Sequence, residues 1–220
     1  MGGDPLRLAR RDGIAIRRSI LREVLDPAQV MLLYYIINKE KVDKWPLRKW
    51  SEKLDYSSMS ISRAWKELAA IELCEGQKKG RNLILDFMGS ARELWERALP
   101  YLHSPVRHRK IAIVDHIDNL RLRRAGVTAL ADYSLISKDA RPEYAIKLSD
   151  WNAAKKQSIV NEVSPANDLG VVIETWSYDP KIIAPGSENV DALSLYLSLQ
   201  DAPDERIQGA LKEMLGGLPW

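Results

Sequence analysis

The chain contains 220 residues, of which 45% are hydrophobic and 29% are charged. This composition argues against wholesale disorder and allows either two domains of about 100 residues or one larger domain. The first residues are charged and lack the apolar segment of a signal peptide, and no apolar run approaches the ~20 residues that span a bilayer. The one cysteine, Cys74, cannot form an internal disulfide. We therefore expect a cytoplasmic protein without a membrane partner.

The charge is distributed unevenly along the chain. Residues 1–110 carry 22 Lys and Arg against 14 Asp and Glu, a net charge of +8, whereas residues 111–220 carry 11 against 16, a net charge of −5. A basic half joined to an acidic half suggests that the first half meets a polyanion and the second does not.

A short arm followed by a strand or a helix is expected over residues 6–25, and two helices are expected after it. Residues 26–41 are apolar on nearly all sides, and Asp26 with Gln29 has the spacing of a capping box. Residues 45–56 form the second helix. Its apolar face is predicted from the spacing of Leu47, Trp50 and Leu54.

A third helix is expected from the serine-rich stretch DYSSMSISRAWKELAAIELCE, which begins at Asp55. Serine is unfavourable in helix interiors, so the cluster indicates a cap or an exposed surface, with Ser57 or Ser58 as the N-cap. The inward face is predicted to consist of Ile61, Trp65 and Leu68. The outward face is then small, polar and basic, and it consists of Ser58, Ser60, Ser62, Arg63 and Lys66.

A basic β-hairpin and a further helix are predicted next. Residues 73–75 and 81–87 have the composition of strands, and GQKKG between them is a glycine-bounded turn. A helix over residues 90–102 begins with a capping box formed by Ser90 and Glu93.

Three helices followed by a basic hairpin are the order of a winged helix-turn-helix that binds duplex DNA. A helix fits the major groove, where Arg63 can donate two hydrogen bonds to a guanine edge and small hydroxyl groups allow close approach. Lysines and arginines around this helix can neutralise phosphates. The predicted DNA-binding residues are Arg48, Lys49, Ser58, Ser60, Ser62, Arg63, Lys66, Lys78, Lys79 and Arg81.

The segment LRKWSEKLDYSSMSISRAWKELAAIELCEGQKKGRNLILDF resembles the winged-helix segment of bacterial MarR-type transcriptional regulators. In that family an S-x-x-T-V-S-R-x-L-x-x-L-x-x-x-G-L run is the recognition helix, and a charged hairpin follows. The sequence departs from this pattern at Glu72, where the family usually has glycine. The resemblance covers roughly residues 26–102. The matching residues are Ser60, Ile61, Ser62, Arg63, Leu68 and Leu73.

The second half is expected to be a separate α/β domain, residues 111–220, after a polar linker at residues 103–110. Helical elements interrupted at Gly126 are predicted over residues 110–134. Strands are predicted at residues 143–148, 157–163 and 170–178, and closing helices at residues 190–199 and 201–217.

AGVTALADYSLI and VDALSLYLSLQDAPDERIQGALKEML weakly resemble the C-terminal domains of AbiEi-type antitoxins. Those are winged-helix proteins that repress their own operon and counter a nucleotidyltransferase-like toxin. The resemblance implies a partner-binding or sensing role for this half.

The sequence also contains candidates for a nuclease site and for a metal site. A restriction-like nuclease needs acidic residues on neighbouring strands with a lysine nearby, and Glu162, Asp168 and Glu174 are the candidates. Glu174 is not followed by the lysine that such a site requires. The histidines, His103, His108 and His116, together with Asp115, fit no common metal site. We therefore expect no metal, no cofactor and no enzymatic activity.

The sequence thus predicts an α+β protein in which a winged helix-turn-helix domain, residues 1–102, precedes a C-terminal α/β domain. The expected function is transcription regulation by a homodimer, since regulators of this kind read paired half-sites on DNA. The C-terminal domain is expected to dimerise, to bind a small-molecule ligand or to hold a protein partner. The alternatives are an antitoxin-like protein-interaction module and a nuclease.

Overall fold

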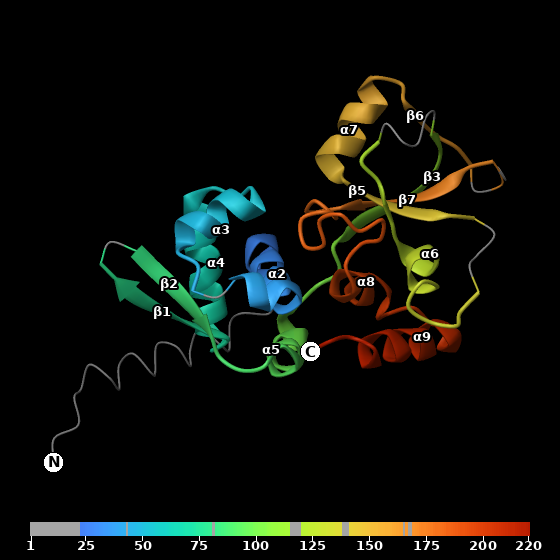
Figure 1. Cartoon of the computed structure of the whole chain (residues 1–220). Helices are drawn as coiled ribbons and strands as arrows, with labels where there is room; N and C mark the ends of the chain where they lie inside the picture. Colours follow the sequence, from blue (N-terminus) through green and yellow to red (C-terminus); the bar gives the residue numbers. More distant parts are fainter. Residues whose placement is uncertain are drawn as a thin grey trace, which may run out of the picture. The chain divides into compact units, whose positions relative to one another are not determined.

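The computed structural model describes residues 23–42, 44–80, 82–114, 120–137, 141–164, 166 and 169–220. The chain divides into two compact units: one consists of Met1–His103 with Trp220, and the other of Ser104–Pro219. The protein is a mixed α+β protein, as the sequence predicts (Figure 1). Within the described ranges, no helix has both the length and the apolar character needed to cross a bilayer.

The first unit has the predicted order of helices and strands. Its elements are α2 (Asp26–Val42), α3 (Leu47–Leu54), α4 (Ser58–Ala70), β1 (Cys74–Lys79), β2 (Asn82–Phe87), α5 (Ala91–Ala98) and the 3-10 turn η1 (Leu99–Tyr101). The predicted capping box of α5 is present, because Ser90 and Glu93 each bond the other's backbone N–H. The predicted turn at residues 76–80 is wrong. Most of it is strand, and the chain reverses between Lys79 and Asn82, which face each other across the hairpin.

Aromatic side chains fill the core of the first unit. Trp50 of α3 is 1% exposed and lies edge-on to both Tyr34 of α2 and Trp45, with ring centroids 6.1 and 5.4 Å away. Its ring is also 6.1 Å from that of Phe87 on β2, so one residue joins three segments of the unit. The predicted inward residues Ile61 and Leu68 are fully buried, and Trp65 is only half-buried.

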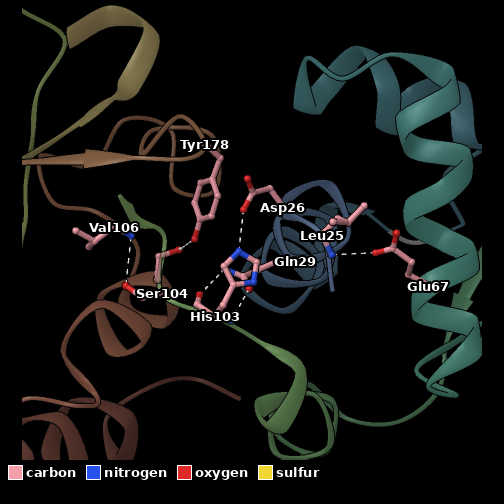
Figure 2. A network of polar contacts seen from close by, with 9 residues as sticks. Leu25, Asp26, Gln29, Glu67, His103, Ser104, Val106 and Tyr178 are labelled. Atoms are coloured by element: carbon pink, nitrogen blue, oxygen red, sulfur yellow. Dashed lines mark hydrogen bonds and ion pairs between the residues drawn. The ribbon is translucent and has the colours of Figure 1, made fainter. Parts of the chain in front are cut away.

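Gln29 has a role that differs from the predicted one. Its buried side chain accepts a hydrogen bond from the backbone N–H of His103 and donates one to the backbone C=O of the same residue, both at 2.9 Å. Asp26 lies 2.8 Å from Nε2 of His103 (Figure 2). The pair that resembles a capping box in the sequence therefore holds the last residue of this unit against the start of α2.

The second unit is built on a five-stranded sheet with the order β4–β5–β7–β3–β6. Only β5 and β7 are parallel, and the other neighbours are antiparallel. The strands are β3 (Val106–Val114), β4 (Arg123–Arg124), β5 (Glu143–Lys147), β6 (Val160–Glu162) and β7 (Val171–Trp176). The helices are α6 (Gly126–Leu130), α7 (Leu148–Lys156), α8 (Ala192–Leu199) and α9 (Glu205–Gly216).

Residues 103–134 differ most from the sequence expectation. The predicted linker, residues 103–110, is wrong in extent because β3 begins at Val106. The predicted helices are also wrong at residues 110–114, which belong to β3, and at residues 120–125, which precede α6; residues 115–119 lie outside the described part of the chain. The first half of β3 is polar and exposed, so it has no alternating pattern. Its identity as a strand comes from pairing with β7 and β6, which lie more than 40 residues later.

The two faces of this sheet carry different side chains. α7, which the sequence analysis did not predict, packs Trp151 and Ala154 against Ala112, Ile146 and Ile173 on one face. The alternation of side chains along a strand places Glu143, Glu174 and Arg109 on the opposite face.

Candidate nucleic-acid interface

A three-residue connection joins α3 to α4. Asp55 directly follows α3 with a left-handed φ of 54°, and Asp is one of the residues that tolerate this conformation. The hydroxyl of Ser51 donates a 2.6 Å hydrogen bond to the backbone C=O of Tyr56. These features define a tight turn between two helices whose inner faces share the aromatic core.

The serines at the start of α4 have two separate roles. Ser57 is the N-cap, because its hydroxyl accepts a 3.1 Å hydrogen bond from the backbone N–H of Ser60. The hydroxyl of Ser60 is 2.9 Å from that of Ser57, and the Ser60 side chain is half-buried. Ser60 therefore contributes mainly to the cap. Ser58 is exposed and Ser62 is half-buried, so Ser58 is the more accessible of the remaining serines.

An exposed stripe runs along α4 and consists of Met59, Arg63 and Lys66. Spacings of four and three residues place these side chains on one face of a helix. Met59 is 66% exposed, whereas Arg63 and Lys66 have no acidic partner among the described residues. The sequence analysis missed Met59, although its spacing of four residues from Arg63 was a visible signal. We call Met59, Arg63 and Lys66 the α4 stripe.

Glu67 adds a negative charge close to the α4 stripe. Its carboxylate accepts a 2.9 Å hydrogen bond from the backbone N–H of Leu25, the residue that precedes α2 (Figure 2). This bond ties α4 to the start of α2.

The cations of α3 already have neighbours within the first unit. Nε of Arg48 lies 2.8 Å from Glu52, but both side chains are largely exposed. Nζ of Lys49 lies 4.1 Å from the centroid of the Trp45 ring. Exposed ion pairs of this kind contribute about 0–1 kcal/mol, so a phosphate group can compete with Glu52 for Arg48.

An isolated β-bridge joins the hairpin to the segment before α3. Pro46, the residue before α3, forms an isolated antiparallel bridge with Ile84 of β2. Lys78 is exposed on β1, Lys79 ends that strand, and Arg81 lies outside the described residues. Glu75 and Asp86 face each other across the strands. The hairpin therefore carries both signs of charge, and its lysines lie at the tip.

The turn after α4 contains the residue that departs from the MarR-type pattern. The N–H of Leu73 donates to the C=O of Leu68, and the N–H of Glu72 donates to the C=O of Ala69, as in a Schellman motif. Glu72 occupies the left-handed position of this motif with a φ of 58°. Its C=O also accepts a hydrogen bond from Arg97 of α5. The turn thus forms without the glycine, at the cost of a strained Glu72.

Replacing Glu72 by glycine is expected to raise the free energy of unfolding by up to about 1 kcal/mol. The change removes the ~1–2 kcal/mol cost of a left-handed side chain, and the greater flexibility of unfolded glycine offsets part of the gain. Urea denaturation of the full chain measures this effect. Glu96→Gly, inside α5, is the matched control and should lose about 1 kcal/mol. A Glu72→Gly variant that is less stable than the native protein would contradict the proposal that the backbone of Glu72 is strained.

The acidic residues considered for a nuclease are not brought together. Glu162 on β6 lies 2.7 Å from Lys155 and 3.6 Å from Lys110, and the hydrogen bond from Lys155 is the main cause of its lowered pKa. Glu174 lies on β7, and β3 separates the two strands. Asp168 is outside the described residues.

Burial raises the pKa of Glu174 to about 7, and its carboxylate accepts a 3.0 Å hydrogen bond from Trp176. This environment suits a neutral, structural carboxyl group more than a cation ligand.

The two described histidines belong to different units. His103 is bonded to Asp26 and Gln29 in the first unit, whereas His108 lies on β3 of the second unit. Asp115 and His116 are outside the described residues. In the part of the chain that the structure describes, no three His, Cys, Asp or Glu side chains are grouped to hold a metal ion.

Comparison with known proteins adds no family to this picture. No family model, no curated protein and no solved structure matches the chain.

Proposed function

We propose that the first unit is a winged helix-turn-helix domain and that the protein is a DNA-binding transcriptional regulator. The observation that carries this proposal is the arrangement of α3 and α4, a tight helix pair whose second helix exposes two cations without acidic partners among the described residues. The bridge from Pro46 to Ile84 supports the role of the hairpin as the wing.

In this proposal α4 enters the major groove. Arg63 donates two hydrogen bonds to the O6 and N7 atoms of a guanine, and Lys66 neutralises a phosphate. Met59, which lies one turn of α4 before Arg63, supplies an apolar surface for the methyl group of a thymine. Ser58, Arg48, Lys49 and the lysines at the hairpin tip contact the sugar-phosphate backbone.

We further propose that the protein acts in the cytoplasm as a homodimer, because paired half-sites require two copies of α4. The second unit then supplies the dimer contact or responds to a ligand. The exposed Met59 also suits a protein surface, so an antitoxin-like interaction module is the second candidate.

A titration of the full chain against duplex DNA from upstream of its own gene tests the proposal. Arg63→Ala is expected to weaken binding by about 1–3 kcal/mol and to relax the preference for the specific duplex over a shuffled one. The affinity of the native chain should fall steeply with salt, because phosphate contacts release counterions. Fluorescence anisotropy at two salt concentrations measures both effects.

Arg92→Ala is the matched control. Arg92 is an exposed arginine of α5, paired with Glu96, and it is outside the α4 stripe. Its removal should leave the sequence preference unchanged. Equally weak binding of all duplexes, unaltered by Arg63→Ala, would reject the role of α4. Capture of a defined protein partner that depends on Met59 would then favour the interaction module.

A further inference from the structure

A basic cavity lies in the second unit, beside the edge strand β4. Its volume is about 600 Å³, within the usual range for small-molecule sites. Four cationic side chains line it, from Arg121, Arg123, Arg124 and Lys181, together with apolar groups that include Leu122 and Tyr144. This concentration of positive charge lies in the half of the sequence that is acidic overall, so the net charge of that half does not explain it.

The wall of the cavity is held by backbone hydrogen bonds. β4 pairs with β5, with Arg124 opposite Tyr144. On the other side of β4, the backbone N–H of Arg124 donates a hydrogen bond to the backbone C=O of Glu188. The backbone C=O of Arg124 accepts one from the N–H of Val190, and both bonds are 2.9 Å long. Asp179 accepts a 3.0 Å hydrogen bond from the backbone N–H of Lys181 and so shapes the loop after β7. The cations are therefore presented by a pre-formed frame, which reduces the entropy cost of binding.

The cations of the cavity differ in their internal partners. Arg124 is neutralised by Glu188 at 2.9 Å and Asp132 at 3.5 Å. Arg121 and Lys181 have no ion-pair partner among the residues that the structure describes. Nε of Arg123 is buried and lacks a hydrogen-bond partner within the same residues. A buried donor without an acceptor costs about 1–3 kcal/mol. The Nη1 group of Arg123 donates one long hydrogen bond, 3.4 Å, to the C=O of Leu122, and an anion in the cavity can compete for it.

The pKa of Lys181 is lowered, chiefly by partial burial. Arg121 and Arg123 contribute by repulsion, while Asp179 and Asp150 act in the opposite direction. Two arginines and two carboxylates thus surround Lys181, and the lowered pKa follows mainly from burial of its charge. A bound anion would be attracted to Arg121, Arg123 and Lys181 and would offset the cost of burying the lysine's charge.

A second hollow adjoins the basic one. It has a volume of about 310 Å³ and shares Leu120 and Arg121 with the larger cavity. Its other walls include Ile146, Ala153 and the carboxylate of Asp150. Gln157 also lines it, so its wall mixes apolar groups with polar groups that can donate and accept hydrogen bonds. Such a wall suits the organic part of a ligand, such as a sugar, whose anionic end lies among the cations.

We propose that the second unit binds the phosphate group of a small molecule, held by Arg121, Arg123 and Lys181. Arginine matches phosphate oxygens with paired hydrogen bonds, and lysine adds a point charge. The adjoining hollow favours an organic phosphate over inorganic phosphate. The proposal is independent of DNA binding by α4, and it gives the second unit a ligand of defined chemistry.

Calorimetric titration of the full chain with ADP, ribose 5-phosphate, inorganic phosphate and adenosine tests this site. ADP and ribose 5-phosphate are expected to bind, and adenosine, which has no phosphate, is not. Lys181→Gln should weaken binding by about tenfold or more, the loss expected for one charge-assisted hydrogen bond. Arg123→Gln should do the same. Lys212→Gln is the matched control, because Lys212 is an exposed lysine of α9 that does not line the cavity.

The outcomes distinguish an organic phosphate from inorganic phosphate as the ligand. They also distinguish failure of this site from failure of DNA binding by α4. Inorganic phosphate that binds as tightly as ADP would support the phosphate site and assign it an inorganic ligand. Absence of binding in the millimolar range, or binding that both cavity variants leave unchanged, would overturn the site. A loss of duplex DNA affinity in Lys181→Gln without any added ligand would also overturn it, since the cations would then serve nucleic acid. Arg63→Ala should bind ADP normally, so failure of the α4 interface leaves this test intact.

Discussion

Replacing Gly126 by alanine should lower the free energy of unfolding by roughly 2–5 kcal/mol. Gly126 begins α6 with a φ of +53°, a conformation that costs a residue with a Cβ atom about 1–2 kcal/mol. A Cβ atom at this position would also lie 1.3 Å from Oε2 of Glu143. Overpacking of this kind typically costs a further ~1–3 kcal/mol.

The Glu143 side chain cannot easily move away from an added methyl group. It is buried, it pairs with Arg109, and it accepts a 2.9 Å hydrogen bond from the backbone N–H of Val127. The N–H of Glu143 in turn donates to the hydroxyl of Thr128 at 2.9 Å. These contacts connect α6 to β5, so a displaced carboxylate would leave a buried N–H unsatisfied.

Urea denaturation of the full chain, followed by circular dichroism, measures the effect. Gly209→Ala is the matched control, because Gly209 lies inside α9 with open space around its Cα atom. That change should stabilise the protein by about 0.5–1 kcal/mol. Equal and small effects at the two glycines would show that Glu143 does not approach Gly126 in solution.

Replacing Glu174 by glutamine should stabilise the protein above neutral pH and have little effect in acid. The pKa of Glu174 is raised to about 7 by burial, although Trp176 and Arg109 favour its charged form; Glu143 raises the pKa further. The folded state therefore holds a proton that the unfolded state releases near pH 4.5. The contribution of this proton to the free energy of unfolding is therefore complete below pH 4.5, and it is lost as the pH rises through about 7.

The size of this effect follows from the shift in pKa. A change from 4.5 to about 7 corresponds to about 3 kcal/mol, lost by the native protein between pH 4 and pH 8. A glutamine at position 174 can still accept the hydrogen bond from Trp176, and it never ionises. The advantage of Glu174→Gln should therefore grow from near zero at pH 4 to about 3 kcal/mol at pH 8.

Thermal or urea denaturation at a series of pH values measures the difference between the two proteins. Burial also raises the pKa of Asp191, to about 6, but this group is common to both proteins and cancels in the comparison. Glu162→Gln is the control of opposite sign, because the pKa of the exposed Glu162 is lowered by Lys155. That variant should be no more stable than the native protein at pH 8. A pH-independent difference for Glu174→Gln would reject the raised pKa.

Sequence reasoning succeeded where the structural signal is local. The α-helices of the first unit, the N-cap predicted at Ser57 or Ser58 and found at Ser57, and the capping box of Ser90 and Glu93 all depend on residues within one or two turns. In the second unit, β5, β7, α8 and α9 were predicted for the same reason, since β-branched runs and capped apolar periods are visible in one segment.

Sequence reasoning failed where partners are distant in the chain. The polar start of β3 resembles a linker until it pairs with β7, and Gln29 resembles a capping residue until it meets His103. The sequence also does not distinguish the exposed Glu162 from the buried Glu174. Their different pKa values arise from burial and from neighbours such as Trp176.

The sequence by itself determined the mixed α+β composition, the helices and hairpin of the first unit, and the exposed positions Arg63 and Lys66 of α4. These follow from periodicity, capping and charge, which act over a few residues. Only the tertiary structure decided that residues 106–114 complete a five-stranded sheet and that Gly126 must lack a side chain. It also brought Lys181 to the arginines near β4. Each of these features depends on contacts across 15 or more residues, as between Glu143 and Thr128 or between β3 and β7, and no local pattern encodes such contacts.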